Sequence, residues 1–227
     1  MDVQQRTDDL KNKFQKASSP LEEILKNAPP GDRKVHANAL LCLARATMTN
    51  YNITVQAYTA EHIQQIAWAT RNLLELSVWT DYCAKSSNNA NRFLTDALRD
   101  GMGIFRAMEN LSSLATKNPR TLKNLAANKV MIDTAKRQLS DGAVKLGVSN
   151  LDHRYKKLGA VVKELGETQA TAYNNAIALL SKFVHPTSLI VTMDLDSSWT
   201  KPMIDGFFEI ALAFADGSLN EIASANL

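Results

Sequence analysis

The sequence predicts an all-α protein, folded as a single-domain bundle of about six to eight helices. Apolar residues recur at three- and four-residue spacing along almost the whole chain, while the alternation typical of strands is nearly absent. Nine glycines and six prolines are few for 227 residues, which argues against an architecture with many turns. One short stretch, SLIVTM at 188–193, is compatible with a strand-like connection.

Residues 1–30 are predicted to form a helical appendage to the bundle domain of residues 31–227. A Ser-Pro-Leu-Glu capping box at 19–22 has proline at the first helical position, so a helix is expected to begin there. A Pro-Pro-Gly-Asp sequence ends that helix, and its aspartate, Asp32, is expected to cap the next one.

Thr59 is expected to open a third helix with a broad buried face. Thr70 falls on that face, where its hydroxyl can bond to the preceding turn. The apolar residues of the face are Ile63, Ile66, Ala67, Leu73, Leu74, Val78 and Trp79. Further helices are expected over 89–116 (loosened near Gly101 and Gly103), over 155–165, from 168 into 179–187, and from 198 through 203–215.

Composition places the chain among ordinary globular proteins, with 45% hydrophobic and 22% charged residues. Its polar N-terminus lacks the apolar core of a signal peptide. The strongly apolar run FFEIALAFA contains Glu209 and is far shorter than the roughly 20 residues that span a bilayer. We therefore expect a cytoplasmic protein of a bacterial type, with no membrane segment.

The sequence offers no motif for a metal or a cofactor. Cys42 and Cys83 lie far apart with no CxxC spacing, so both are expected to be buried, reduced thiols. No two histidines have ligand spacing such as HxxxH, and no P-loop, dinucleotide fingerprint, HExxH or GxSxG is present. We expect no cofactor.

Charge is unevenly distributed along the chain, although the net charge is only +3. Residues 117–163 contain eleven Lys or Arg and three acidic residues, whereas residues 188–227 contain six acidic residues and one lysine. A basic segment can attract a phosphate backbone through counterion release. Two other interpretations remain open: the lysines coat the solvent side of a helical hairpin, or the basic and acidic segments pair in the fold or across a dimer.

The third predicted helix carries the first candidate site. Arg71 and Glu75 lie four residues apart and share a face bordered by apolar residues. The pair is either an ordinary ion pair beside the core or a half-buried functional pair. Trp68, Trp79 and Tyr82 lie on the same helix and could wall a pocket.

The LLSKFVHPT sequence at 179–187 carries the second candidate site. Asn174, Ser181 and His185 line up along one edge of the helix at helical spacing. Pro186 disfavours the α conformation at His185, which places the imidazole at or just past the helix end. There it could act as a general acid or base, or it could simply bond the last carbonyls of the helix.

A third group of charges lies on the next predicted helix, and two of them, Arg92 and Asp96, could border a cleft with the first two candidate sites. Arg92, Asp96 and Arg99 form a ladder at four- and three-residue spacing. The plainer interpretation of this ladder is a solvated stripe on the helix surface.

The two motifs ATRNLLELSVWTDY (69–82) and LLSKFVHPT resemble the signatures of a family of bacterial all-helical proteins of uncharacterised function. Those signatures are Arg-x-x-x-Glu followed by aromatics, and Leu-Ser-x-x-x-His-Pro. The resemblance spans roughly residues 35–215. More distantly, the pattern is similar to the HEPN-like helical domains, many of which are metal-independent ribonucleases of defence systems that work as dimers.

The HEPN-like resemblance implies roles for particular residues. His185 would be the general acid or base, with Ser181 as a polar helper and RNA or another phosphate-bearing ligand as the partner. HEPN enzymes have an arginine a few residues before the histidine; here the nearest cation is Lys182. In this hypothesis Arg71 supplies the guanidinium from the neighbouring helix, and Glu75 orients either Arg71 or His185.

Two hypotheses from other functional classes compete with the hypothesis that this is an RNA-acting, homo-oligomeric protein. In one, Arg71, Glu75 and His185 form a buried network in a non-catalytic helical interaction module. In the other, the aromatic residues of the third helix wall a pocket for a small ligand.

Overall fold

The computed structural model describes residues 2–114, 129–138, 140–141, 144, 157–184 and 198–227. Every regular element in these residues is an α-helix, so the all-α prediction is confirmed. No helix within these ranges is long and apolar enough to cross a membrane. The expected connection at 188–193 lies outside the described residues. The helices are α1 (Val3–Asn27), α2 (Asp32–Thr59), α3 (Ile63–Ala84), α4 (Ser87–Leu114), α6 (Leu158–Leu165), α7 (Glu167–Val184) and α9 (Thr200–Ser224), and residues 129–138 are also helical.

The first helix, α1, begins at Val3, so the prediction that a helix starts at Ser19 is wrong. Pro20 lies inside α1, and the hydroxyl of Ser19 donates to the carbonyl of Gln15 at 2.8 Å. Tertiary packing outweighs the capping signal, because most of the stability of a helix comes from burial of one face. That face follows a seven-residue pattern: Val3, Thr7, Leu10, Phe14, Ala17, Leu21 and Ile24.

Two short turns separate the next helices. Gly31, with a φ of 150°, precedes α2, so Asp32 lies in the first helical turn and makes no side-chain cap. Thr59 is the last residue of α2 and does not open α3, which starts at Ile63. Between these helices Glu61 adopts the left-handed conformation, with a φ of 55°, and this residue breaks the helical path.

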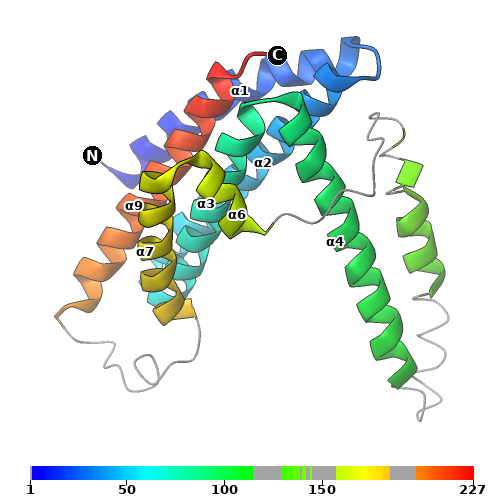
Figure 1. The fold of residues 1–227 in the computed structure, drawn as a ribbon. Helices are drawn as coiled ribbons and strands as arrows, with labels where there is room; N and C mark the ends of the chain where they lie inside the picture. Colours follow the sequence, from blue (N-terminus) through cyan, green and yellow to red (C-terminus); the bar gives the residue numbers. More distant parts are fainter. Residues whose placement is uncertain (1, 115–128, 139, 142–143, 145–156, 185–197) are drawn as a thin grey trace.

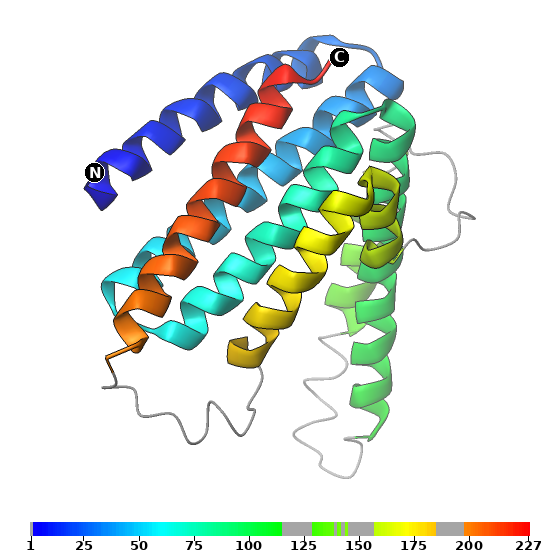
Figure 2. The same ribbon diagram turned by 60° about the vertical axis from the view of Figure 1, so that its left-hand side comes forward.

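The central helix is α3, which contacts α2, α4, α6, α7 and α9. It runs parallel to α9, since the Thr70 hydroxyl reaches the carbonyl of Phe207 and, further along both helices, Asp81 lies near Glu221. Figures 1 and 2 show α9 and α4 on opposite sides of α3, with α7 packed beside it.

The core consists of two neighbouring clusters. The larger one is formed by α1, α2, α3, the start of α4, α6 and α9, and the smaller one by the end of α2, the first half of α3, α7 and the start of α9. Val55, Tyr173 and Phe214 border both clusters. Leu10, Ala17 and Leu21 of α1 belong to the larger cluster, so α1 packs into the same core as the other helices.

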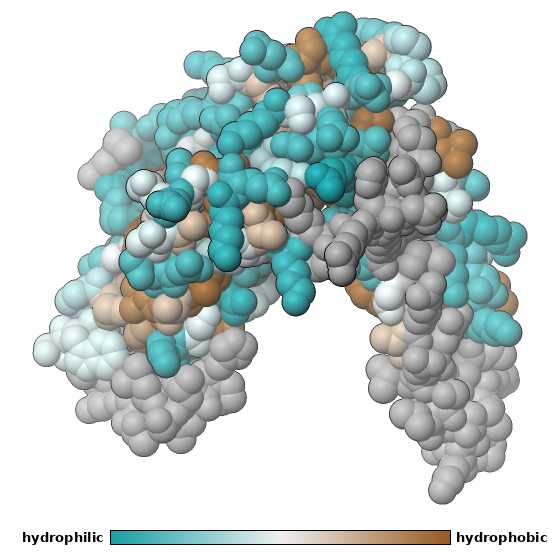
Figure 3. Space-filling view, viewed as in Figure 1, coloured by the Kyte–Doolittle hydropathy of each residue, from teal (hydrophilic) through white to brown (hydrophobic). Residues whose placement is uncertain are grey.

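The fourth helix, α4, projects away from the bundle as an arm (Figure 1). Near its start, the ring of Phe93 packs on Trp79 of α3 at a centroid distance of 5.1 Å. The helix is continuous through Gly101 and Gly103, so the expected loosening there is wrong. The space-filling view shows a broad hollow between this arm and the lobe that carries α7 and α9 (Figure 3).

The two cysteines differ in environment. Cys83 is buried, as predicted, and burial raises the pKa of its thiol. Cys42 is exposed on α2, so the prediction that both thiols are buried is wrong for this residue.

Candidate functional site

Three consecutive residues of α3 face three different neighbours, because each residue turns a helix by about 100°. Thr70 faces α9 and also bonds back to the carbonyl of Ile66 at 2.7 Å, as the sequence predicts. Asn72 faces α2, where its Nδ2 donates to Oδ1 of Asn50 at 3.2 Å. Arg71 turns toward the side of α3 on which α7 lies.

The arc of α3 opposite Thr70 is only partly covered by these neighbours. Trp68, Arg71, Asn72 and Glu75 lie on it at positions i, i+3, i+4 and i+7. Trp68 is 44% exposed and the other three are half-buried. Thr70 faces α9, so this arc lies on the side of α3 away from α9, and Figure 1 shows α4 on that side. We call these four residues the open face of α3.

Arg71 and Glu75 form the predicted i,i+4 pair. Nε of Arg71 donates to Oε1 of Glu75 at 3.2 Å, and the two side chains are 28% and 35% exposed. Within the described part of the chain, Glu75 is the only hydrogen-bonding partner of Arg71, so both terminal guanidinium nitrogens keep their donors. The pair therefore holds the guanidinium in place without using its terminal N–H groups.

Tyr173 of α7 joins this pair across the helix interface. Burial raises the pKa of its hydroxyl, the nearby Glu75 carboxylate raises it further, and Arg71 acts in the opposite direction. The sequence analysis missed Tyr173, although a signal was present. The apolar stripe of α7 through Ile177 and Leu180 continues back by one helical step to this tyrosine.

The predicted polar stripe of α7 lies on the side of the helix away from α9. Phe183 packs against Phe207 of α9, with ring centroids 5.1 Å apart. Asn174, which is exposed, and Ser181, which is half-buried, lie about 160–180° around α7 from Phe183. Lys182 is exposed and has a partner.

His185 lies outside the described residues. α7 ends at Val184, which is about 16 Å along the helix from Tyr173. The structure therefore brings Arg71 and Glu75 to Tyr173, in the first half of α7, while the histidine follows the other end of that helix.

The predicted pocket of Trp68, Trp79 and Tyr82 does not form. Trp79 packs edge-on against Tyr82 at 5.9 Å and on Phe93 of α4 at 5.1 Å. Trp68 lies eleven residues before Trp79, about 16 Å away along α3, and makes no ring contact within the described residues. Trp79 thus joins α3 to α4 as a core side chain.

The predicted ladder on α4 is partly inside the protein. Asp96 is buried, with only 6% of its surface exposed, and is engaged with a partner, while Arg92 is half-buried. A solvated stripe is therefore wrong for Asp96. The side chain of Arg99 lies outside the described part.

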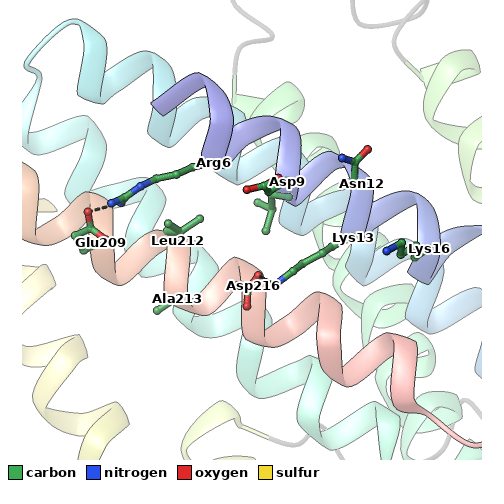
Figure 4. A pocket seen from close by; sticks show the side chains of 10 residues that line it. Arg6, Asp9, Asn12, Lys13, Lys16, Glu209, Leu212, Ala213 and Asp216 are labelled. Carbon is green, nitrogen blue, oxygen red and sulfur yellow. Dashed lines mark hydrogen bonds and ion pairs between the residues drawn. The ribbon is translucent and has the colours of Figure 1, made fainter. Parts of the chain in front are cut away.

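Two acidic residues of α9 pair with α1. Arg6 bonds Glu209, and Lys13 bonds Asp216 (Figure 4). Among the described residues, these two carboxylates are engaged by α1 and not by the basic segment. Several exposed cations of that segment are described, namely Lys129, Arg137, Lys157 and Lys163.

The same ion pairs border a groove of about 540 Å³ between α1 and α9 (Figure 4). Both partners of the second pair lie seven residues beyond those of the first, so the two helices run parallel in register. Leu10, Leu212 and Ala213 line the groove between the charges. Neither α1 nor α9 contributes to the open face of α3.

In the ranges that the structure describes, no group of three or more histidine, cysteine, aspartate or glutamate side chains is arranged to hold a metal ion. His36, one of the histidines, is buried, and its Nε2 lies 2.8 Å from the carbonyl of Cys83. No family model, no curated protein and no solved structure matches this chain.

Proposed function

We propose that this protein is an HEPN-like helical protein that acts on RNA or on a nucleotide, and that the open face of α3 holds a phosphate of its substrate. The guanidinium of Arg71 is the observation that carries this proposal. Glu75 fixes its Nε, while its terminal nitrogens have no partner among the described residues. The end-on pair of N–H groups on these two nitrogens matches the geometry of a phosphate.

In the ribonuclease form of the proposal, His185 transfers a proton and no metal ion takes part. The 2′-hydroxyl of the RNA loses its proton to a general base as its oxygen bonds to phosphorus. The bond to the 5′-oxygen breaks, that oxygen gains a proton, and a cyclic phosphate remains. His185 serves as the acid or the base of this exchange, and Arg71 stabilises the charge on the phosphate.

The exposed cations Lys129, Arg137, Lys157 and Lys163 support contacts to a phosphate backbone. Binding that depends on such contacts weakens steeply as the salt concentration rises. The proposal also includes a bacterial, cytoplasmic setting in a defence or stress system.

A homodimer is part of the same proposal. Ile104 of α4 and Val130 and Met131 of the helix at 129–138 are 61%, 67% and 57% exposed. Apolar side chains of this size on an arm outside the core support contact with a second copy. Light scattering coupled to size exclusion tests this point, and a monomer at all concentrations contradicts it.

The decisive experiment is an RNA binding and cleavage assay on the parent chain and three variants. His185→Ala removes the proton-transfer group, and Arg71→Ala removes the phosphate contact. Arg45→Ala is the matched control, because Arg45 is an exposed arginine of α2 that pairs only with Glu22. Thermal melts confirm that each variant is folded.

We expect Arg71→Ala to weaken binding and slow cleavage, His185→Ala to abolish cleavage, and Arg45→Ala to match the parent. Loss of one phosphate contact is expected to reduce the affinity about tenfold. Cleavage that persists unchanged in His185→Ala contradicts the catalytic role of that residue. A parent chain that binds neither RNA nor a nucleotide contradicts the whole proposal.

One observation favours the alternative function, a non-catalytic interaction module. Arg71, Glu75 and Tyr173 join α3 to α7, as a structural polar network does. In that case Arg71→Ala lowers the melting temperature by several degrees, and Arg45→Ala does not. If Arg71→Ala melts like the parent, the network is not structural.

A further inference from the structure

Trp68 is the most exposed part of the open face of α3. Its side chain is 44% exposed, and no aromatic ring of the described residues packs on it. The residues one turn away on α3 are polar, namely Gln64, Gln65, Arg71 and Asn72. A large indole held outside the core among polar neighbours offers one flat face to a ligand that stacks.

Asn72, one turn after Trp68, has an amide of fixed orientation. Its Nδ2 donates to Oδ1 of Asn50 at 3.2 Å, and Nδ2 of Asn50 donates to the carbonyl of Ala46 at 2.9 Å. This chain of bonds determines which end of the Asn72 amide is nitrogen. In the described part of the chain, its oxygen and its second N–H have no partner, so one acceptor and one donor remain.

We propose that the open face of α3 binds an adenine nucleotide unit, either free or as part of an RNA strand. The base stacks on Trp68, its edge bonds to Asn72, and its phosphate is held by Arg71. This inference rests on the proposed function, because it uses the same phosphate contact, and it adds a base-recognition subsite and a preferred base.

The spacing of the three residues fits one nucleotide. Trp68, Arg71 and Asn72 lie at i, i+3 and i+4, so their Cβ atoms are about 5–6 Å apart. The base and the phosphate of one nucleotide are separated by a similar distance across the sugar. A stacked base therefore places its own phosphate within reach of the Arg71 guanidinium, whose Nε stays on Glu75.

The chemistry of the amide selects adenine. An asparagine side chain pairs with adenine by donating to N7 and accepting from the N6 amino group. The corresponding edge of guanine presents two acceptors, N7 and O6, and leaves the amide oxygen of Asn72 without a donor. A purine also covers more of an indole than a pyrimidine does, so uracil and cytosine are expected to bind more weakly.

The test is titration of the full chain with AMP, GMP and UMP by calorimetry, and with labelled oligoadenylate and oligouridylate strands by anisotropy. The variants are Trp68→Ala, Trp68→Phe and Asn72→Ala. Trp199→Ala is the matched control, because Trp199 is also exposed, at 39%, but precedes α9. Circular dichroism melts confirm that every variant is folded.

The parent is expected to bind AMP more tightly than GMP or UMP. Trp68→Ala weakens binding of AMP and oligoadenylate at least about fivefold, since stacking on one aromatic residue accounts for that much or more. Trp68→Phe restores most of the affinity, and Asn72→Ala brings AMP and GMP close to equal affinity. Trp199→Ala leaves all affinities unchanged.

Several results would overturn the inference. One is that Trp68→Ala binds AMP with the affinity of the parent, and another is that the parent binds GMP or UMP as tightly as AMP. Alternatively, Trp68→Ala separates a dimer into monomers and the parent binds no nucleotide, in which case Trp68 belongs to a protein interface.

The outcomes also separate this inference from the proposed function. RNA binding that depends on Arg71 but not on Trp68 leaves the proposed function standing and removes the adenine subsite. AMP binding through Trp68 without any binding or cleavage of RNA keeps the subsite and removes the ribonuclease. If the parent binds neither AMP nor RNA, both fail.

Discussion

Asp81 is a half-buried carboxyl near the C-terminal end of α3. Burial raises its pKa to about 6, the nearby Glu221 carboxylate contributes to the rise, and Lys85 acts in the opposite direction. An acid whose pKa is higher in the folded state than in the unfolded chain favours folding when it is protonated. The cost of burying its charge is therefore absent below about pH 4 and fully present above about pH 6.

We predict that Asp81→Asn raises the melting temperature at about pH 8, because the amide removes the buried charge and keeps the size of the side chain. The gain should shrink as the pH falls from about 6 to 4, where the parent carboxyl is protonated as well. Asp9→Asn, at an exposed position of α1, is the control and should show a much smaller difference. A gain that is constant over this range would show that Asp81 does not carry the effect.

At the candidate site, the sequence could predict the side-chain contacts that lie within a single helix. The Arg71–Glu75 pair and the back-bond of Thr70 follow from helical spacing alone. Contacts between helices could not be predicted from helical spacing, because the packing of the bundle determines which side of α7 meets Arg71. For that reason Tyr173 was missed, and Trp79 was assigned to a pocket although it packs on Phe93.

Among the helices, α1 contains a proline that costs it a backbone hydrogen bond, and the packing of the helix outweighs this cost. Pro20 lies inside the helix and has no N–H to donate to the carbonyl four residues earlier, which belongs to Lys16. The side chain of Pro20 is exposed, so its replacement disturbs no core contact.

We predict that Pro20→Ala increases the free energy of unfolding by about 1–3 kcal/mol, because alanine restores the missing hydrogen bond and favours the helix. Chemical denaturation measures the difference. Pro202→Ala is the matched control, since Pro202 is exposed in the first turn of α9, where the backbone N–H that alanine adds has no helical acceptor. Equal effects of the two substitutions would mean that the position inside α1 is not the cause.

The boundaries of the elements were harder to predict than their existence. The capping box at Ser19 and the threonine at position 59 are good local start signals, yet both lie inside helices. In each case a buried stripe already leads up to the signal: Leu10 and Ala17 precede Ser19, and Thr54 and Ala57 precede Thr59. Helix propensities differ between residues by a few tenths to about 1 kcal/mol. The free energy gained by burying a side chain is larger than this difference.

At the scale of the whole molecule, the role of α1 can be tested directly. Leu10 and Leu21 are each 1% exposed within the larger core cluster. Burial of each such side chain contributes about 1.5–3 kcal/mol, and the whole protein is expected to be stable by only about 5–15 kcal/mol.

We therefore predict that a chain lacking residues 1–28 unfolds at a much lower temperature than the parent, or loses cooperative unfolding, because α2 and α9 would expose the surface that α1 covers. Calorimetry and size exclusion measure the two effects. Melting of the shortened chain at the parent temperature would identify residues 1–30 as an independent appendage. Substitution of the exposed residues Gln5 and Asn12 by alanine controls for changes on the outer side of α1.

The parallel direction of α1 and α9 has a mechanical consequence. The start of α1 and the end of α9 lie at opposite ends of the helix pair (Figure 2), and a 25-residue helix is about 37 Å long. Tension applied to these two ends pulls the helices past each other along their axes. The Arg6–Glu209 and Lys13–Asp216 pairs then bear the load simultaneously, in shear, and are not peeled apart one after the other.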